Sequence, residues 1–286
     1  MSLQLAIQSI DRECCPVIAP VRGRDANTMP WEGSRQWAGK VVTSIIPVIA
    51  RSRLLELAIE SLLLQDEPPF IILVDTGSVD PQPIESLRTR NQIDVISIRS
   101  SGWKHPSMPV ASALNAAWSM VATPFCHLGH DDAILKRRDL MAEAIELAAI
   151  HKAVGYQISP RNYAGWEREL GHTFTVLDVK AMDMIGLSWN MREYCHQTGK
   201  PMNPHLGTGN DPDTERQMNR LLALNGINPH FIGFERNYER TNDDQIDHVR
   251  SRTSGLLYSP THSAKAELWE SDAITQARLR HSSWLQ

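Results

Sequence analysis

Carboxylates stand at two places where an apolar run of the sequence ends. The pair Asp131–Asp132 follows the run 124–128, and Asp75 closes the run 70–75, with Asp80 after a Gly-Ser turn. Adjacent carboxylates repel each other and are costly to bury, so a hydrophobic core does not account for them. Their oxygens suit a hard divalent cation such as Mg²⁺ or Mn²⁺, and a single carboxylate can accept a hydrogen bond from a nucleotide base or a ribose hydroxyl.

A structural explanation also exists for these groups. Aspartates are common in turns and at helix N-termini, where their oxygens accept hydrogen bonds from the backbone. Neighbouring side chains of an extended chain point in opposite directions, so Asp131 and Asp132 are not expected to face the same ligand. We expect Asp131 to face the ligand, and Asp132 to cap the following helix or to brace the site.

Apolar strands and amphipathic helices alternate along the first half of the chain. Strands are expected at 41–49 (with Pro47 marking the end), 70–75, 93–98 and 124–128, and helices at 53–65, 110–122 and 134–150. This alternation is typical of an α/β fold with a largely parallel sheet and helices on both faces. In such sheets ligands bind beyond the carboxyl ends of the strands, and Arg51, Asp75 and Asp131 all come at strand ends.

The second half of the chain is less regular. Strands are expected at 156–159, 174–179 and 230–234. A helix is expected at 212–226, with Asp211 as its N-cap, Pro212 in its first turn and Gly226 at its end. The chain is divided into an N-terminal extension (1–39), a main domain (40–240) and a C-terminal segment (241–286) that packs on the active-site side.

The composition is that of an ordinary globular protein. Of 286 residues 42% are hydrophobic and 22% are charged, and the net charge is −4, which gives no general signal of binding to nucleic acid or to an anionic membrane. The four cysteines follow no zinc-binding or disulfide pattern. We expect a cytoplasmic protein, because the N-terminus does not have the pattern of a signal peptide and no apolar run has the length of a transmembrane segment.

In combination, these segments resemble the nucleotide-sugar glycosyltransferases of the GT-A fold, most closely glycosyltransferase family 2. The resemblance covers about residues 41–150 and rests on SIIPVIAR (44–51), ESLLLQ (60–65), VDTGSVD (74–80), ASALNAA (111–117) and LGHDD (128–132). It implies a Rossmann-like, mixed, mostly parallel central sheet flanked by helices, and makes 40–240 the glycosyltransferase domain. It also implies a set of donor nucleotide-binding residues: Pro47, Arg51, Asp75, Ser78 and Asn115.

The chain departs from the family pattern at three of these motifs, and in the first of them Ala50 replaces a usual Asn. Thr76 replaces the second aspartate of the nucleotide-binding signature, and Gly129 stands where the first carboxylate of the metal motif belongs. The resemblance leaves Asp131 as the carboxylate ligand of a divalent metal, Mn²⁺ or Mg²⁺. Some GT-A enzymes recruit a late histidine as a further ligand, and His248 is the candidate here, with His130 as the alternative.

The catalytic base of the family lies in a Gly-Glu-Asp-x-Asp-Leu motif that opens a helix. GNDPDT (209–214) matches this motif with Asn210 in place of Glu. The match implies that Asp211 is the base that takes the proton from the acceptor hydroxyl, with Asp213 as the second choice. The structural alternative for Asp211 is the N-cap of the helix.

These features favour a glycosyltransferase of the hexosyltransferase type, which moves a sugar from a nucleotide-diphosphate sugar to the hydroxyl of an unknown acceptor. UDP is the expected nucleotide, inversion is the expected outcome, and a divalent metal is expected to assist. Two alternatives stay open: a degenerate domain that binds sugars or partners without turnover, and a sugar-phosphate nucleotidyltransferase. The second alternative needs a glycine-rich loop after the first strand, and PVIARSRLL (47–55) contains no glycine.

Overall fold

The computed structural model describes residues 39–48, 54–76, 82–87, 90, 92–98, 108–158, 169–199, 214–235 and 245–248. Its centre is a seven-stranded sheet with the order β3-β2-β1-β4-β7-β6-β8. The strands are β1 (Val42–Val48), β2 (Phe70–Asp75), β3 (Ile93–Ser97), β4 (Phe125–Gly129), β6 (Ala153–Ile158), β7 (Leu170–Asp178) and β8 (His230–Glu235).

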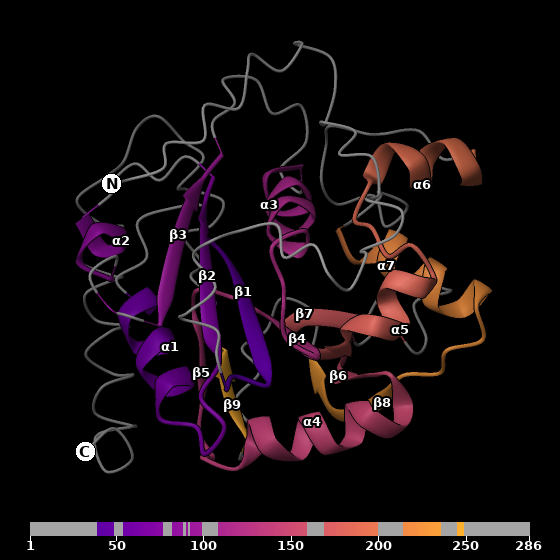
Figure 1. Cartoon of the computed structure of the whole chain (residues 1–286). Coiled ribbons are helices and arrows are strands. Elements are labelled where there is room, and N and C mark those ends of the chain that lie inside the picture. The colour runs from indigo at the N-terminus through magenta and orange to yellow at the C-terminus, as the bar shows by residue number, and fades with distance from the viewer. Residues whose placement is uncertain are drawn as a thin grey trace.

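Most neighbouring strands of this sheet run parallel. The pairs β3–β2, β2–β1, β1–β4 and β6–β8 are parallel, whereas β4–β7 and β7–β6 are antiparallel. The prediction of a mixed, mostly parallel central sheet flanked by helices is therefore confirmed (Figure 1). All the strands predicted at 41–49, 70–75, 93–98, 124–128, 156–159, 174–179 and 230–234 are present, with bounds shifted by a few residues.

The helices cover the two faces of the sheet in two apolar layers. They are α1 (Leu54–Leu63), α2 (Gln82–Leu87), α3 (Met108–Trp118), α4 (Leu140–His151), α5 (Val179–Met184), α6 (Met191–Thr198) and α7 (Thr214–Leu224). Successive residues of a strand point to opposite faces, so Ile45 packs in the layer with α3, α5 and α7, and Ile46 packs in the layer with α1, α2 and α4. Figure 1 shows α1 and α2 on one side of β1–β3 and α3 on the other.

The segment after the carboxylate pair differs from the prediction. Helix α4 begins at Leu140, not at residue 134, because Ala133–Leu135 form strand β5, which pairs antiparallel with β9 (Ile246–His248). Ile134 and Leu135 are almost fully buried in this small sheet. The residue at the N-cap of α4 is Asp139, so the prediction that Asp132 caps this helix is wrong.

Two side chains of the ESLLLQ motif hold this segment in place. Ser61 Oγ accepts a hydrogen bond from the backbone N–H of Leu135 (3.1 Å) and donates one to Ala58 O (2.7 Å). Gln65 Oε1 accepts from the backbone N–H of Met141 (3.1 Å) and Nε2 donates to Arg137 O (2.8 Å). The motif therefore connects the end of α1 to the chain on both sides of the turn that leads into α4.

Pro47 lies inside β1 and does not end it, contrary to the prediction. The carbonyl of Val48 accepts from the backbone N–H of Thr76, which follows β2 (2.9 Å), so the nitrogen of Pro47 faces the other side of the strand. On that side the pairing with β4 ends at Ile45 and Leu128. A proline is tolerated here because no partner strand needs the hydrogen that it lacks.

Helix α7 ends as the sequence predicts. Gly226 has a φ of 69°, a left-handed conformation that glycine adopts without strain. Ile227 N–H donates to Leu222 O (3.0 Å) and Gly226 N–H donates to Ala223 O (3.1 Å), the pair of bonds that closes a helix C-terminus.

Among the described residues, no helix combines the length and apolar character needed to cross a lipid bilayer.

Candidate functional site

Asp75 ends β2 and Asp131 follows β4, and these two strands pair with β1 on its two sides. Asp75 is the register partner of Val48, the last residue of β1. On the other side Ile45 pairs with Leu128, and three residues further along each chain lie Val48 and Asp131. β4 ends at Gly129, so Asp131 lies in the turn beyond the paired part of that strand, at the same carboxyl edge of the sheet as Asp75.

Thr76 closes the end of β1, which gives a structural reason for the missing second aspartate. Its hydroxyl and its backbone N–H both donate to Val48 O, at 3.0 and 2.9 Å. A carboxylate at this position would have no hydrogen to donate to that carbonyl. Asp75 is only 3% exposed, and its own carbonyl accepts from Ile98 N–H (2.8 Å), so β1, β2 and β3 are joined at the carboxyl edge.

The LGHDD motif forms the end of β4 and the turn that follows it. Gly129 is the last residue of β4, and the half-buried Asp131 and Asp132 lie in the turn before β5. In the β5–β9 ladder Ala133 is the register partner of His248. His248, from near the end of the sequence, therefore pairs with the residue that lies two positions after Asp131. A shared metal site requires the two segments to meet in this way.

Gly129 leaves room for the ring of His127. A Cβ atom at position 129 would lie 2.7 Å from His127 Cε1 and 2.9 Å from Ile46 Cδ1, both closer than Cβ atoms normally approach. The imidazole cannot easily move away, because Ser44 Oγ holds its Nδ1 at 2.7 Å and the ring packs on Phe174 with a centroid distance of 4.7 Å. The absence of the first carboxylate of the motif is thus coupled to the presence of His127.

His127 is neutral in this environment. Its side chain is buried, and burial lowers the pKa of the imidazole to about 3. Its Nε2 has no hydrogen-bond partner within the part of the chain that the structure describes. A neutral imidazole therefore lies beside Gly129 at the end of β4, the position at which the pattern of glycosyltransferase family 2 has a charged carboxylate.

Asn115, predicted to bind the donor, makes a structural hydrogen bond. Its Oδ1 accepts from the backbone N–H of Trp189 (3.0 Å), which joins α3 to the segment that precedes α6. Trp189 is fully buried and its indole Nε1–H donates to Nε2 of the buried His172 (3.2 Å). Burial, with a smaller contribution from His130, lowers the pKa of His172 to about 3.

The structure brings together only part of the predicted site. Pro47, Asp75 and Asp131 lie at the carboxyl edge around β1, Asn115 lies on α3, and β9 places His248 beside β5. The remaining predicted site residues lie outside the described residues: Arg51, Ser78, Asp211 and Asp213.

The ligand types around Asp131 fit a divalent cation whose coordination a substrate completes. A carboxylate and an imidazole both bind Mn²⁺. In the described ranges no three His, Cys, Asp or Glu side chains lie close enough to hold a metal ion together. Cations that activate nucleotides are commonly bound by one or two protein ligands plus substrate phosphates.

His127 and His172 are not among the functional residues predicted from the sequence. His127 lies in the predicted strand 124–128, whose other residues are apolar, and His172 lies two residues before the predicted strand 174–179. Their place in or beside a predicted strand was the only sequence signal for them, because a histidine buried in a central strand needs polar partners from elsewhere in the fold.

A cleft of 930 Å³ lies elsewhere, between α6, α7, β6 and β8, and no predicted site residue lines it.

Comparisons with known proteins give matches at the level of structure. No protein-family model and no curated protein matches the sequence. The structure is similar to the mannosyltransferase PcManGT from Pyrobaculum calidifontis, solved in complex with GDP-Man and Mn²⁺, with 16% identity, a TM-score of 0.47, and coverage of 85% of this chain and 75% of that one.

Two further solved structures have similar scores. TarS 1–349 from S. aureus in complex with UDP-GlcNAc has 12% identity and a TM-score of 0.46, covering 85% of this chain and 73% of that one. Glucosyl-3-phosphoglycerate synthase from M. tuberculosis has 13% identity and a TM-score of 0.46, covering 74% and 77%. At this level of similarity, the function of the chain is inferred from its own residues.

Proposed function

We propose that this chain is a GT-A glycosyltransferase that transfers a sugar from a nucleotide-diphosphate sugar, UDP-linked, to an acceptor hydroxyl with inversion and with help from a divalent metal. The observation that supports the proposal is the parallel strand order β2-β1-β4, in which Asp75 ends β2 and Asp131 follows β4 at the same edge of the sheet. Two carboxylates on either side of a central strand suit a ligand with a base at one end and a diphosphate at the other. The motifs of both groups are those that the sequence shares with glycosyltransferase family 2.

The donor half of the site lies beside β1 and β2. Asp75 accepts hydrogen bonds from the base or the ribose of the nucleotide, and Arg51 and Ser78 contribute to binding from the loops that follow β1 and β2 in the chain. Pro47 supplies an apolar surface at the end of β1. A charged guanidinium in this group favours the anionic diphosphate.

The diphosphate half of the site lies at the turn after β4. Asp131, which shortly precedes β5, and His248, which ends β9, would be the protein ligands of Mn²⁺ or Mg²⁺, since these two strands pair with each other. When bound, the cation neutralises the charge that grows on the departing nucleoside diphosphate. By holding the cation, Asp131 would also set the place of the diphosphate relative to Asp75.

Transfer requires a base on the acceptor side. Asp211, or Asp213 in its place, takes the proton of the acceptor hydroxyl. At the same time the oxygen of that hydroxyl bonds to the anomeric carbon of the sugar. The bond from that carbon to the diphosphate oxygen breaks on the opposite face, and the nucleoside diphosphate leaves with the electron pair. The in-line geometry inverts the configuration at the sugar carbon.

The experiment measures release of UDP from UDP-glucose and UDP-GlcNAc, with and without Mn²⁺, and the melting temperature with UDP. We expect Asp131→Asn to lose the Mn²⁺-dependent rise in melting temperature, and Asp211→Asn to bind donor but to lose turnover. The matched control is Asp66→Asn, an exposed carboxylate that precedes β2 at the opposite edge of the sheet. If no nucleotide-sugar shifts the melting temperature of the wild-type chain under any condition, the proposal is wrong.

Gly129 favours a second candidate, a domain that binds sugar nucleotides or partners without turnover. With His127 filling the space beside Gly129, the site has one carboxylate fewer than the family pattern. Binding of UDP with a measurable affinity, together with no release of UDP from any donor, would favour this candidate over the enzyme.

A further inference from the structure

The cleft between α6, α7, β6 and β8 combines charged groups with an apolar wall. Gln157, Glu169 and Arg216 line it where β6 ends and where β7 and α7 begin. Apolar side chains line it where α7 ends and β8 begins: Leu222, Ala223, Ile227, Pro229 and Phe231. Its volume of 930 Å³ is that of a site for a small organic ligand.

The charged side chains that line the cleft have a positive sum. They are Arg216 and Arg220 of α7 and Glu169, which directly precedes β7. Arg216 Nη1 donates to Glu169 Oε1 at 2.8 Å, and the two side chains are only 9% and 15% exposed, so these two charges compensate each other. The charge of Arg220 is therefore in excess on the wall of the cleft.

Arg220 has a neutral partner. Its Nη1 donates to Gln197 Oε1 on α6, and Gln197 Nε2 donates in turn to Glu193 Oε1 (2.9 Å). Within the described part of the chain, Arg220 forms no ion pair. Arg216 and Arg220 are also four residues apart on one face of α7, a spacing at which like charges destabilise a helix. A bound anion would remove this repulsion.

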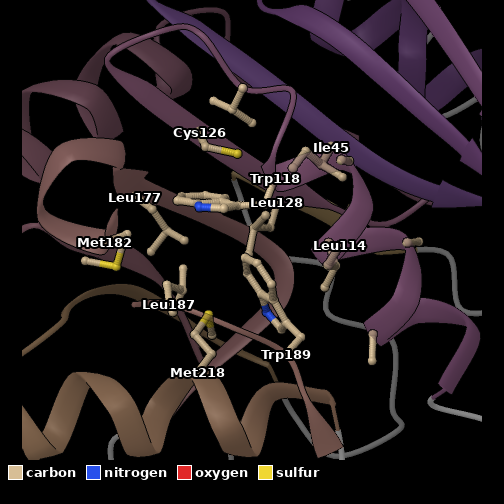
Figure 2. Packing of buried hydrophobic residues seen from close by; sticks show 14 of the residues in the cluster. Ile45, Leu114, Trp118, Cys126, Leu128, Leu177, Met182, Leu187, Trp189 and Met218 are labelled. Atoms are coloured by element: carbon tan, nitrogen blue, oxygen red, sulfur yellow. The ribbon is translucent and has the colours of Figure 1, made fainter. Parts of the chain in front are cut away.

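Helix α7 is a fixed wall of the cleft. Part of its surface packs into the core, and Figure 2 shows Met218 in the buried layer that also holds Leu187 and Trp189. The side chain of Asn219 makes two hydrogen bonds with the backbone of Leu170 at the start of β7 (2.8 and 2.9 Å). The arginines are thus presented by an anchored helix, so a ligand would meet a preformed site.

We propose that this cleft is a binding site for a small anionic ligand that carries a phosphate or carboxylate group on an apolar body. The guanidinium group of Arg220 binds the anion, because its N–H donors match the oxygens of either group. The apolar side chains at the end of α7 and the start of β8 contact the body of the ligand. The site is separate from the proposed donor site, since none of the residues assigned to the nucleotide or the metal lines the cleft.

Isothermal titration calorimetry of the full chain without divalent metal tests the site with four probes. Phenyl phosphate and benzoate carry the two anions on an apolar body, inorganic phosphate lacks the body, and benzyl alcohol lacks the charge. We expect phenyl phosphate or benzoate to bind about tenfold more tightly than inorganic phosphate, and benzyl alcohol to give no measurable binding. Arg220→Gln keeps a polar side chain but loses the charge, and should weaken binding of the anionic probes by about ten- to a hundredfold.

A second variant should change the affinity in the opposite direction. Glu169→Gln keeps an acceptor for Arg216 but removes the negative charge from the cleft, so the anionic probes should bind about three- to tenfold more tightly. A merely structural disturbance would weaken binding instead. The matched control is Arg138→Gln, an exposed arginine (64%) beside Asp66 and outside the cleft, which should bind the probes like the wild type.

Four results would overturn the inference: no binding of either organic anion, equal binding of benzyl alcohol, unchanged affinity in Arg220→Gln, or an equal loss in Arg138→Gln. Binding that UDP abolishes but Arg220→Gln leaves unchanged would place the anion at the donor site. The inference does not rest on the proposed function, because the measurement needs neither metal nor turnover. Absence of turnover with nucleotide-sugars would overturn the proposed function alone.

Discussion

The missing side chain at Gly129 makes room for the ring of His127. The two residues lie on the same face of β4, and the imidazole occupies the space that a Cβ at 129 would need. Ser44 and Phe174 hold the ring from β1 and β7. At the scale of single residues, a departure from a family motif is thus explained by a neighbour two positions earlier in the sequence.

Gly129→Ala should destabilise the fold by about 1–3 kcal/mol, because the new methyl group forces His127 or Ile46 out of position. The free energy of unfolding in urea measures the effect. In His127→Ala the space is open, so adding Gly129→Ala to that background should cost much less. An equal cost of Gly129→Ala in both backgrounds would show that His127 is not the obstacle.

Acid should destabilise the protein through His127 and His172. Both have a pKa lowered to about 3 by burial, whereas an exposed histidine in the unfolded chain titrates near 6.5. Below pH 6.5 the unfolded state takes up protons that the folded state does not, so stability falls as the pH drops from about 6.5 to 3. Each histidine contributes a slope of at most about 1.4 kcal/mol per pH unit.

Unfolding free energies measured in urea between pH 7 and pH 4 check this slope. His127→Asn removes one of the two buried histidines. The plot of its unfolding free energy against pH should therefore be less steep than that of the wild type by the contribution of one histidine. A parallel curve would mean that His127 is already protonated in the folded protein.

At the scale of elements, α1 supports the turn that carries the carboxylates. Ser61 and Gln65 bond to the backbone of Leu135, Arg137 and Met141, on both sides of the turn into α4. These bonds explain why a Ser and a Gln at the end of a helix accompany the LGHDD motif. Ser61 and Gln65, from the ESLLLQ motif, thus contribute to the site by holding β5 in place, and β5 in turn pairs with β9.

Gln65→Ala should cost about 1–3 kcal/mol, because it leaves the buried N–H of Met141 without its acceptor. Hydrogen exchange should accelerate at 135–141 and at β9 more than in β1 and β2. Ser119→Ala is the control, since the Ser119 hydroxyl donates to Ala116 O on an exposed turn (2.8 Å). A uniform acceleration over all strands in Gln65→Ala would contradict a local supporting role.

At the scale of the whole molecule, the C-terminal part of the chain reaches the proposed metal site. Residues 245–248 pair with the strand directly after Asp131–Asp132, and Lys136 N–H donates to Gln245 O (2.8 Å) at the end of that ladder. Of the segment 241–286 the structure describes residues 245–248, and the packing of the segment on the active-site side stays a prediction. A region that looked polar and irregular in the sequence thus completes a sheet.

His248→Ala should lower the affinity for Mn²⁺ in the presence of UDP by about ten- to a hundredfold, because one protein ligand is lost. The unfolding free energy without metal should stay within about 0.5 kcal/mol of the wild-type value. Electron paramagnetic resonance of Mn²⁺ titrated against the UDP complex measures the affinity. Unchanged Mn²⁺ binding in His248→Ala would return the role of second ligand to His130.

The elements of the first half follow from local sequence patterns. Buried strands such as 70–75 are continuous apolar runs, and the spacing of leucines in 53–65 is helical, so both are determined by residues that are neighbours in the chain. The motifs at the strand ends then predict which edge of the sheet carries polar groups. The helix predicted at 134–150 was wrong over its first six residues, because Ile134 and Leu135 find a strand partner more than a hundred residues away.

By itself, therefore, the sequence determined the alternation of strands and helices and the set of carboxylates at the strand ends. Only the tertiary structure decided which segments meet: β2 and β4 on the two sides of β1, His248 opposite Ala133, and Trp189 on His172. The physical reason is that helix and strand periodicity is a local property of the chain. Register between strands and contacts between buried rings depend on how distant segments pack, and nothing in the local pattern of either segment specifies the other.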